Sequence, residues 1–434
     1  MTKVLLIGNG AREHAIAKAI VRSSENPVLY AYMKANNPGI KKLCEDVVLG
    51  SYSDLDEIKA FAQSMAADFC VVGPEDPLNN GVVDALEEVG IPCVGPKKEL
   101  AKLETSKSFT RLLMKKHNIS GNPLFKVFES MDGIKEYLEE LTEYVIKPDG
   151  LTGGKGVKVT GDHINSIEEG VSYCKEVLDA HPSVVVEEKL EGEEFSLQSF
   201  SDGTNIVDCV PVQDHKRAFV DDKGPNTGGM GSFSDSNHLL PFLKQEHVDA
   251  AHKITLEMCK AIKDETGEEY KGVMYGGFIV TKDGVKLIEY NARMGDPEAM
   301  NVLAIMETDF VELCRAIVSG YIDEYEMKFS DKATVCKYAV PEGYPTDPVK
   351  NEKVSFKDTE VEVFYASVDL KEDGLYMTGS RAIAFVGIGS TLEEAEKKAE
   401  EAVCSVEGKV FHREDIGTKE LIQKRIDHMK ELLG

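Results

Sequence analysis

The sequence VIKPDGLTGGKGV, residues 145–157, is the stretch from which the fold class follows most directly. An apolar strand ends at Lys147, and four glycines between residues 150 and 156 form a loop before the chain turns apolar again. A Walker A loop would instead end in GK[ST] and lead into a helix. Mobile backbone N–H groups beside Lys147 and Lys155 suit a triphosphate that must be enclosed and released. A hairpin without function would only be weakened by these glycines.

A charged bend follows further along the chain. The apolar strand Val184–Glu188 runs into a bend around Leu190, and the chain leaves it through a second strand, Glu194–Ser201. A run of charges is usually a solvated surface. Placed after the lysine strand, the bend can also form a hinge that meets an adenine, with a carboxylate for the ribose hydroxyls.

The segment KLIEYNARMGDPE, residues 286–298, combines oxygen ligands with a cation. Alternation along a strand puts Glu289, Asn291 and Arg293 on one face. Carboxylate and amide oxygens suit Mg²⁺, and a planar guanidinium suits a phosphate or a carboxylate. An exposed polar face of a sheet is the alternative, and it explains poorly why a hydrophobic run should end in these three residue types.

Residues 1 to about 100 alternate strands with helices, which predicts an open parallel sheet with ligands at the carboxyl ends of its strands. In the first turn, Gly8-Asn9-Gly10, Glu13 stands where a dinucleotide fingerprint needs a third small residue. The second strand, Leu29–Met33, also lacks the expected acidic residue. A nicotinamide site is therefore excluded, which leaves an anion site at the helix start or a purely structural glycine turn.

Residues 213–217 (QDHKR) and 224–231 (GPNTGGMG) belong to a polar segment that is too long for a simple turn. We expect Asp214 to be a counter-charge to an ammonium group. His215 is interpreted as a positioning or solvated histidine, in preference to a general base.

Composition limits the class of protein. A chain of 434 residues predicts two to four domains. A net charge of −26 argues against a nucleic-acid partner, and no apolar run reaches the ~18 residues of a membrane span. Nine scattered cysteines without a CxxC pair predict free thiols in a reducing compartment, and hence a cytoplasmic location.

These motifs, in this order, resemble those of the ATP-grasp superfamily, and the chain is similar over nearly its full length to the phosphoribosylamine–glycine ligase family. The resemblance rests on Ile7–His14 (IGNGAREH), Val71–Pro77 (VVGPEDP), Leu103–Phe109 (LETSKSF), Ile146–Val157, QDHKR, GPNTGGMG, Ile288–Glu298 and Arg413–Gly417 (REDIG). It implies a multi-domain α/β fold with three parts. These are a domain with an open parallel sheet (residues 1–102), a two-lobed α+β ATP-grasp domain (103–325, with a mobile lid lobe at about 120–192) and a small α/β domain (326–434).

The resemblance implies ATP-dependent ligation of glycine to 5-phosphoribosylamine through a glycyl phosphate, in purine biosynthesis. ATP and Mg²⁺ or Mn²⁺ are expected, with small-molecule partners alone and a monomer or small homo-oligomer. Another ATP-grasp ligase or carboxylase is the alternative. A non-catalytic nucleotide-binding protein would be expected to lose one of Lys147, Glu289, Asn291 or Arg293, and all four are present.

The resemblance also assigns roles to residues. The expected ATP-binding residues are Lys107, Lys147, Gly153, Gly154, Lys155, Gly156, Glu187, Glu188, Leu190 and Glu194. The expected metal ligands are Glu289 and Asn291. The expected substrate-binding residues are Gly10, Arg12, Glu75, Asp214, Lys216, Arg293, Asp296 and Glu298. Arg293, Lys147 and Asp214 are expected to be catalytic.

Three segments depart from the family pattern. Residues 34–39 (KANNPG) replace a small-residue segment after the second strand, and residues 364–369 (FYASVD) stand where the family usually has His-Ala-Gly-Thr. Residues 275–278 (YGGF) carry no acidic metal ligand, so the number of bound metals stays open.

Overall fold

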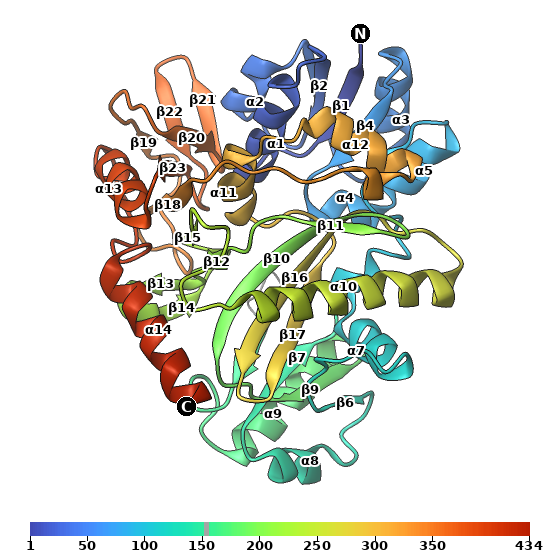
Figure 1. Ribbon diagram of the computed structural model, residues 1–434, viewed down its shortest axis with the longest axis vertical. Coiled ribbons are helices and arrows are strands. Elements are labelled where there is room, and N and C mark those ends of the chain that lie inside the picture. Colours follow the sequence, from blue (N-terminus) through green and yellow to red (C-terminus); the bar gives the residue numbers. More distant parts are fainter. Residues whose placement is uncertain (152–155) are drawn as a thin grey trace.

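The computed structural model describes residues 1–151 and 156–434, which form three parts (Figure 1). The first is a five-stranded sheet in the order β3-β2-β1-β4-β5, and every pairing in it is parallel. Its strands are β1 (Lys3–Ile7), β2 (Val28–Met33), β3 (Asp46–Leu49), β4 (Phe69–Val72) and β5 (Cys93–Val94). Its helices are α1 (Ala11–Val21), α2 (Pro38–Leu43), α3 (Leu55–Ser64), α4 (Glu75–Asn80) and α5 (Val82–Glu88). The predicted open parallel sheet is confirmed, and its central strands are apolar because both faces are covered.

The second part is built on an antiparallel sheet in the order β11-β10-β16-β17. Its strands are β10 (Glu193–Asp202), β11 (Ile206–Asp208), β16 (Lys271–Thr281) and β17 (Gly284–Asn291). The helices of this part are α6 (Lys102–Thr105), α7 (Lys107–Lys116), α10 (Gln245–Thr266), α11 (Glu298–Ile305) and α12 (Phe310–Ser319), followed by a short 3₁₀ turn, Ile322–Glu324. Helix α10 lies along β10 and β17 and covers one face of the sheet (Figure 1).

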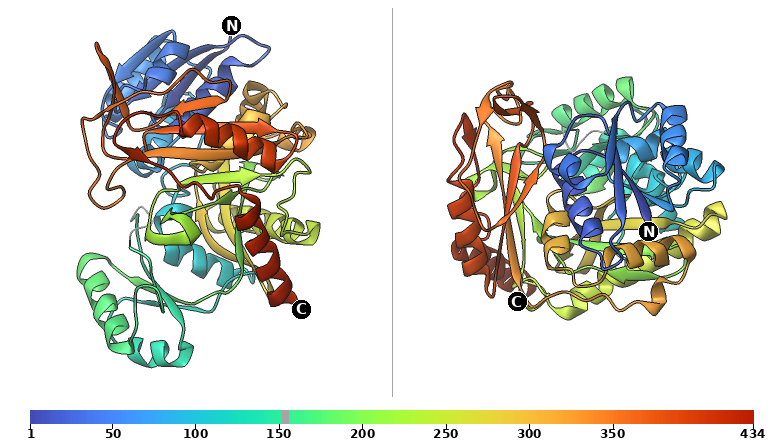
Figure 2. Two further views of the ribbon diagram at one scale, coloured as in Figure 1. Left: turned by 90° about the vertical axis from the view of Figure 1, so that its left-hand side faces the viewer. Right: turned by 90° about the horizontal axis from the view of Figure 1, so that it is seen from above.

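A smaller lobe extends from this second part. Its sheet has the order β6-β9-β7-β8, with β6 (Phe125–Phe128), β7 (Tyr144–Pro148), β8 (Lys158–Val159) and β9 (Val184–Glu188), and its helices are α8 (Ile134–Leu141) and α9 (Ile167–Ala180). Residues such as Leu138, Tyr144 and Val186 form a hydrophobic cluster of its own. Figure 2 shows the lobe projecting from the rest of the molecule. The small lobe therefore has a hydrophobic core separate from that of the central sheet.

The third part crosses the predicted boundary at residues 325/326. Its main sheet has the order β12-β15-β18-β23-β20, and β24 also pairs with β18. The strands are β12 (Gln213–Asp214), β15 (Gly231–Ser234), β18 (Ala333–Pro341), β20 (Glu362–Tyr365), β23 (Ile383–Gly389) and β24 (Val410–Phe411). A small sheet contains β19 (Lys353–Val354), β21 (Val368–Lys371) and β22 (Gly374–Met377), and a hairpin contains β13 (Arg217–Phe219), the 3₁₀ turn Val220–Asp222 and β14 (Lys223–Asn226). The helices are α13 (Leu392–Val403) and α14 (Lys419–Leu433). The polar segment with QDHKR and GPNTGGMG therefore joins the C-terminal sheet to the central part.

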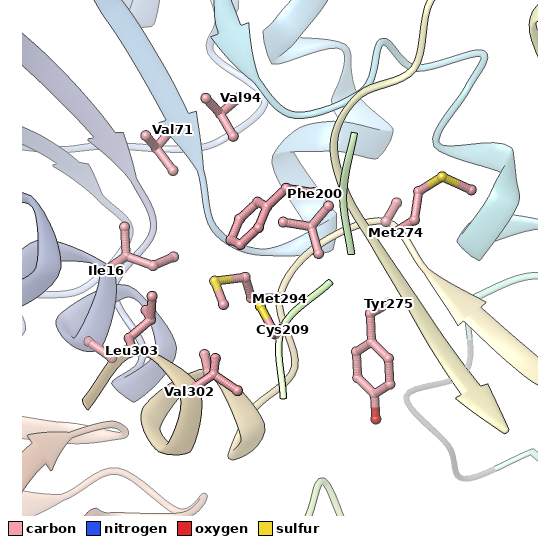
Figure 3. Close-up of a cluster of buried hydrophobic side chains, with 14 of the residues drawn as sticks. Ile16, Val71, Val94, Phe200, Cys209, Met274, Tyr275, Met294, Val302 and Leu303 are labelled. Atoms are coloured by element: carbon pink, nitrogen blue, oxygen red, sulfur yellow. The ribbon is translucent and has the colours of Figure 1, made fainter. Parts of the chain in front are cut away.

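One continuous hydrophobic core connects the N-terminal sheet to the central sheet. Figure 3 shows Ile16 of α1, Val71 of β4 and Val94 of β5 facing Phe200 of β10 and Leu303 of α11. This packing fixes the carboxyl ends of the parallel strands against the central sheet. Within residues 1–151 and 156–434, no helix is long and apolar enough to cross a membrane.

Candidate active site

A cavity of about 440 Å³ lies where the carboxyl ends of the N-terminal strands face the central sheet. The strand order reverses between β1 and β4, and Arg12 and Glu75 follow directly after these two strands. Such a reversal leaves a crevice in which open α/β sheets bind ligands. The cavity lining includes the predicted residues Arg12, Glu75, Lys107, Lys147, Glu187, Asp214, Lys216, Glu289, Asn291, Arg293, Asp296 and Glu298.

One wall is a buried triad of a carboxylate and two cations. Glu187 Oε1 accepts a hydrogen bond from Arg111 Nε at 2.7 Å, and Glu187 Oε2 accepts one from Arg111 Nη2 at 3.0 Å. Lys147 Nζ lies 2.7 Å from Oε2. Burial lowers the pKa of Lys147, and Glu187 opposes that fall. Burial would raise the pKa of Glu187, but Arg111 and Lys147 hold it below its ordinary value. The Glu187 side chain therefore orients Lys147, so a role for Glu187 in an adenine hinge would not involve its side chain.

The glycine-rich loop starts from a fixed point. Asp149 accepts hydrogen bonds from the hydroxyls of Ser106, at 3.2 Å, and Ser183, at 3.0 Å, and Lys107 Nζ donates to the Gly150 carbonyl at 2.8 Å. Ser106 caps helix α7, so these contacts tie the loop to the start of that helix.

The far end of the loop is also held. The predicted ATP-binding residues Gly153, Gly154 and Lys155 lie outside the described residues. Gly156 is described, and its carbonyl accepts a hydrogen bond from Tyr173 of α9 at 2.7 Å. The two described ends of the loop, at Gly150 after β7 and at Gly156 before β8, are therefore both anchored by hydrogen bonds.

The predicted metal ligands lie together at the end of β17. Glu289 Oε1 is 3.4 Å from Lys216 Nζ, and Asn291 Oδ1 accepts a hydrogen bond from Arg293 Nη2 at 3.1 Å. Burial would raise the pKa of Glu289, but Lys216, Lys147 and other cations together lower it to about 2. A carboxylate that stays ionised beside an amide oxygen is a donor set that fits Mg²⁺ or Mn²⁺.

Two arginines, Arg12 and Arg293, form ion pairs with carboxylates near the carboxyl ends of the N-terminal strands. Arg293 Nη2 lies 3.0 Å from Glu104 Oε1, and Arg293 Nε lies 3.4 Å from Glu75 Oε2. Arg12 Nη2 is 3.9 Å from the same Glu75 oxygen. Burial would raise the pKa of Glu75, but Arg293 and Arg12 lower it to about 2. Two guanidinium groups that share one carboxylate form a site that an anionic ligand can enter.

The first glycine turn holds its own carboxylate. The Gly10 N–H donates to Glu13 Oε2 at 2.6 Å, and a Cβ atom at Gly8 or Gly73 would lie within 2.4 Å of Glu13 Cγ. Glu13 therefore occupies the space that the two glycines leave open. Gly10 lies outside the cavity lining formed by the described residues, and its N–H is already paired, so the alternative of a structural turn fits this glycine.

A third region of the cavity is acidic. Burial and the Glu298 carboxylate raise the pKa of Asp214 well above its ordinary value. Gly229, at φ +114°, lets the chain approach closely, since a Cβ atom there would lie 2.7 Å from Asp214 Oδ1. Asp296 Oδ1 accepts hydrogen bonds from Tyr338 OH at 2.6 Å and lies 3.1 Å from Arg381 Nη1. Concentrated buried carboxylates favour a small cationic ligand.

Other predicted residues lie away from the cavity lining that the described residues form. The Glu188 side chain accepts the Leu124 N–H at 2.8 Å, Leu190 is half-buried in the bend and Glu194 is exposed. His215 is buried rather than solvated, burial and Arg413 lower its pKa to about 3, and neither ring nitrogen has a partner in the described chain. His215 was interpreted as a positioning or a solvated histidine, and the solvated alternative is wrong, because the buried ring lies beside Phe233 of β15 with the ring centroids 5.8 Å apart.

The sequence did not single out several residues of the cavity. Arg111 carried a signal, because a charge lies among the buried positions of the amphipathic helix α7. Glu104 lies within LETSKSF but was given no role of its own, and Arg381 carried no local signal, since contacts with distant segments place both side chains. Arg381 Nη1 donates to the carbonyls of Gly228 at 2.8 Å and Asp296 at 2.9 Å, and the guanidinium lies over the Tyr338 ring at 4.7 Å.

Two of the segments that depart from the family pattern contact each other. Asn37 Nδ2 donates to the Tyr365 carbonyl at 2.7 Å, and the Tyr365 N–H donates to His14 Nδ1 at 3.1 Å. Burial and Lys18 lower the pKa of His14 to about 3, which keeps its ring neutral and able to accept. The two departures therefore form one contact, where the C-terminal part meets the N-terminal sheet.

Comparison with known proteins gives one consistent family. Residues 2–104 match the family model of phosphoribosylglycinamide synthetase, N domain; residues 105–299 match its ATP-grasp (A) domain, and residues 334–419 match its C domain. The chain is 51% identical over 433 residues to the phosphoribosylamine–glycine ligase of Methanosarcina acetivorans, covering 100% of this chain and 98% of that protein. It is 51% identical over 443 residues to the protein of the same name from Methanocaldococcus jannaschii, covering 99% of each.

Solved structures agree with the family models. The phosphoribosylamine–glycine ligase of Thermotoga maritima has a TM-score of 0.81 at 27% identity, covering 95% of this chain and 100% of that chain. The biotin carboxylase domain of the 2-oxoglutarate carboxylase from Hydrogenobacter thermophilus has a TM-score of 0.72 at 16% identity, covering 99% and 94%. The second likeness concerns the fold alone.

Proposed function

The chain belongs to the phosphoribosylglycinamide synthetase family, and from that premise we propose how its cavity carries out the ATP-dependent ligation of glycine to 5-phosphoribosylamine. The enzyme is a carbon–nitrogen ligase of purine biosynthesis, and its products are glycinamide ribonucleotide, ADP and phosphate. The observation that carries the proposal is the convergence of three chemically different regions, cationic, arginine-rich and acidic, in a single cavity.

The cationic region is proposed to bind ATP. Lys147, held by Glu187, and Lys107 at the start of α7 would contact the phosphates, and the loop after Gly150 would close over them. The bend around Leu190 would contact the adenine. Glu188 lies at the start of this bend, and Glu194 would lie near the ribose. Lysines aimed at phosphates from fixed elements supply charge neutralisation without reorganisation during the reaction.

Glu289 and Asn291 are proposed to hold Mg²⁺ or Mn²⁺. The ion, when bound, would neutralise phosphate charge during phosphoryl transfer. Lys216 keeps Glu289 ionised in its absence, because their charges lie 3.4 Å apart. Arg293, whose Nη2 donates to the Asn291 oxygen, links this pair to the arginine-rich region.

The other two regions are proposed to bind the substrates that are joined. Arg12, Arg293 and Glu75 would hold the phosphoribosylamine, with the guanidinium groups on its phosphate or near the reacting centre. Asp214, assisted by Glu298 and Asp296, would face the glycine ammonium group. This arrangement leaves the glycine carboxylate to face Lys216 and the ATP phosphates.

The reaction then proceeds in two steps, a phosphoryl transfer followed by an acyl transfer. A carboxylate oxygen of glycine attacks the γ-phosphorus, and the bond to the bridging oxygen of ADP breaks, which gives glycyl phosphate. The ribosylamine nitrogen attacks the glycyl carbonyl carbon, loses a proton and expels phosphate. Arg293 would stabilise the negative charge that develops on the carbonyl oxygen in the second step.

Glycine labelled with ¹⁸O in its carboxylate tests this sequence of steps. One labelled oxygen should appear in the released phosphate for each glycinamide ribonucleotide formed, since the acyl oxygen leaves with phosphorus. Phosphate without label would contradict the glycyl phosphate and leave the family assignment intact.

We also propose that the enzyme acts in the cytoplasm as a monomer or small homo-oligomer. Seven of its nine free cysteines are buried inside the three parts, which suits a reducing compartment. Sedimentation equilibrium gives the mass in solution, and one well-defined small assembly is expected.

A further inference from the structure

Three potential metal ligands meet in the C-terminal part, on residues that do not line the cavity described above. Glu400 lies in the last turn of α13, Cys404 caps that helix, and His412 directly follows β24. Their ligand atoms lie within 4.8 Å of one another. The cluster therefore joins the end of a helix to a strand segment that is separate from it in sequence.

The spacing of the three atoms matches a tetrahedral ion. Glu400 Oε1 lies 3.0 Å from His412 Nε2 and 3.3 Å from Cys404 Sγ, and the sulfur lies 4.0 Å from the same nitrogen. Bonds of ~2.3 Å to sulfur and ~2.0–2.1 Å to nitrogen or oxygen, at tetrahedral angles, separate the ligand atoms by about 3.3–3.6 Å. Shifts of a few tenths of an ångström would place all three around one centre.

The surroundings hold one of the ligands in place. Lys337 of β18 is fully buried, and its Nζ contacts both Glu400 and Glu396, the latter at 2.7 Å. Side chains that contact a metal ligand, as Lys337 contacts Glu400, orient that ligand and tune its basicity. With a dication and a thiolate present, the lysine and the two glutamates leave the whole cluster electrically neutral. Cys404 is exposed, which gives an ion a path of entry.

We propose that Glu400, Cys404 and His412 bind one zinc-class divalent cation, with a water as the fourth ligand. Thiolate and imidazole select Zn²⁺ over Mg²⁺, which prefers oxygen ligands only. The ion links the end of α13 to the segment that leads into Arg413. Arg413 in turn donates to the Arg217 carbonyl at 3.1 Å, within QDHKR. The site is a structural clasp for the C-terminal part.

The test uses the full chain, stripped with a chelator and kept in excess Mg²⁺ so that the Glu289 site is filled. Co²⁺ serves as an optical probe, because a thiolate ligand gives a charge-transfer band in the near ultraviolet, and Zn²⁺ is counted after gel filtration. Cys404→Ser and His412→Gln are compared with Cys44→Ser, which removes a half-buried thiol elsewhere. Circular dichroism without metal confirms that each variant folds.

Wild type and Cys44→Ser should each retain one zinc and show the cobalt band. Cys404→Ser should lose the band, and both cluster variants should bind zinc at least about 10-fold more weakly. Retention of the same zinc by the cluster variants, or a wild type without the band, would overturn the proposal and leave a hydrogen-bonded polar cluster.

Discussion

Replacing Glu187 by glutamine removes the negative charge that Arg111 and Lys147 share, with little change in shape. The side chains of Glu187, Arg111 and Lys147 are nearly inaccessible to solvent. The Glu187 carboxylate lies 2.7 and 3.0 Å from two nitrogens of Arg111 and 2.7 Å from Lys147 Nζ. Breaking a buried ion pair by removing one partner costs about 3–5 kcal/mol, because the other charges stay buried. We take the lower value, about 3 kcal/mol, since the amide oxygen still accepts one hydrogen bond.

The same change alters the titration of Lys147. Burial already lowers its pKa, and Glu187 is the main group that raises it again. An opposite charge at this distance shifts a pKa by about 1–3 units, so the pKa of Lys147 should be lower in the variant by that amount. Because Lys147 must be charged to bind phosphate, activity is lost as the pH rises through its pKa. That alkaline limb should therefore move to lower pH by about 1–3 units.

Two assays separate the effects. The pH profile of kcat/KM for ATP reports the free enzyme and gives the position of the alkaline limb. Hydrogen exchange of the β7 and β9 amides gives the local free energy of opening, and a loss of about 3 kcal/mol corresponds to roughly 100-fold faster exchange. Glu136→Gln, which changes an exposed carboxylate on α8 of the same lobe, is the matched control and should change neither quantity.

The reasoning would be refuted by a Glu187→Gln enzyme with a wild-type alkaline limb and wild-type exchange. That result would mean that Lys147 does not depend on Glu187 for its charge, and that the triad contributes nothing to the stability of the small lobe.

Three further substitutions follow from the cavity. Glu289→Gln should need about 10–100-fold more Mg²⁺ for half-maximal activity, because it removes the charged donor; an unchanged metal titration would exclude Glu289 as a ligand. Asp214→Asn should raise the KM for glycine by about 10–100-fold with ATP unaffected, since a charge-assisted hydrogen bond is worth about 1.5–3 kcal/mol. The pKa of Asp214 is raised, so wild-type kcat/KM for glycine should fall as the pH drops through it, and the variant should lack that acid limb. Arg381→Lys should lower kcat about 10-fold because lysine lacks the planar guanidinium that lies over the Tyr338 ring while Nη1 donates to the Gly228 and Asp296 carbonyls; full activity would show that the C-terminal contact is dispensable.

Much of the fold was predictable because its signals are local. The strands of the N-terminal sheet are short apolar runs bounded by turn residues, and β2 spans Val28–Met33 where Leu29–Met33 was expected. Helix α10 was not singled out, although Ala251, Ile254, Met258 and Ile262 follow a helical period and are buried. Its many charged residues lower the average hydropathy of the segment. The helix was therefore indicated by the spacing of its apolar residues and not by its composition.

The candidate site was predictable where one segment supplies several groups. Glu289 and Asn291 were found together because alternation along β17 puts them on one face, and Arg293, two residues beyond the end of the strand, lines the same cavity. Glu104 and Arg381 could not be found in this way, since the fold brings them to the cavity from distant segments. The burial of His215 depends on β12 joining the C-terminal sheet, which no local pattern indicates.

The central claim is that this cavity couples ATP cleavage to the joining of glycine and 5-phosphoribosylamine. The most direct measurement is ADP release by the purified chain with Mg²⁺, ATP and freshly generated phosphoribosylamine, with and without glycine. The account predicts ADP that depends on glycine and matches glycinamide ribonucleotide in amount. ADP release indifferent to glycine would contradict it, and would leave an ATP-grasp fold that acts on another carboxylate.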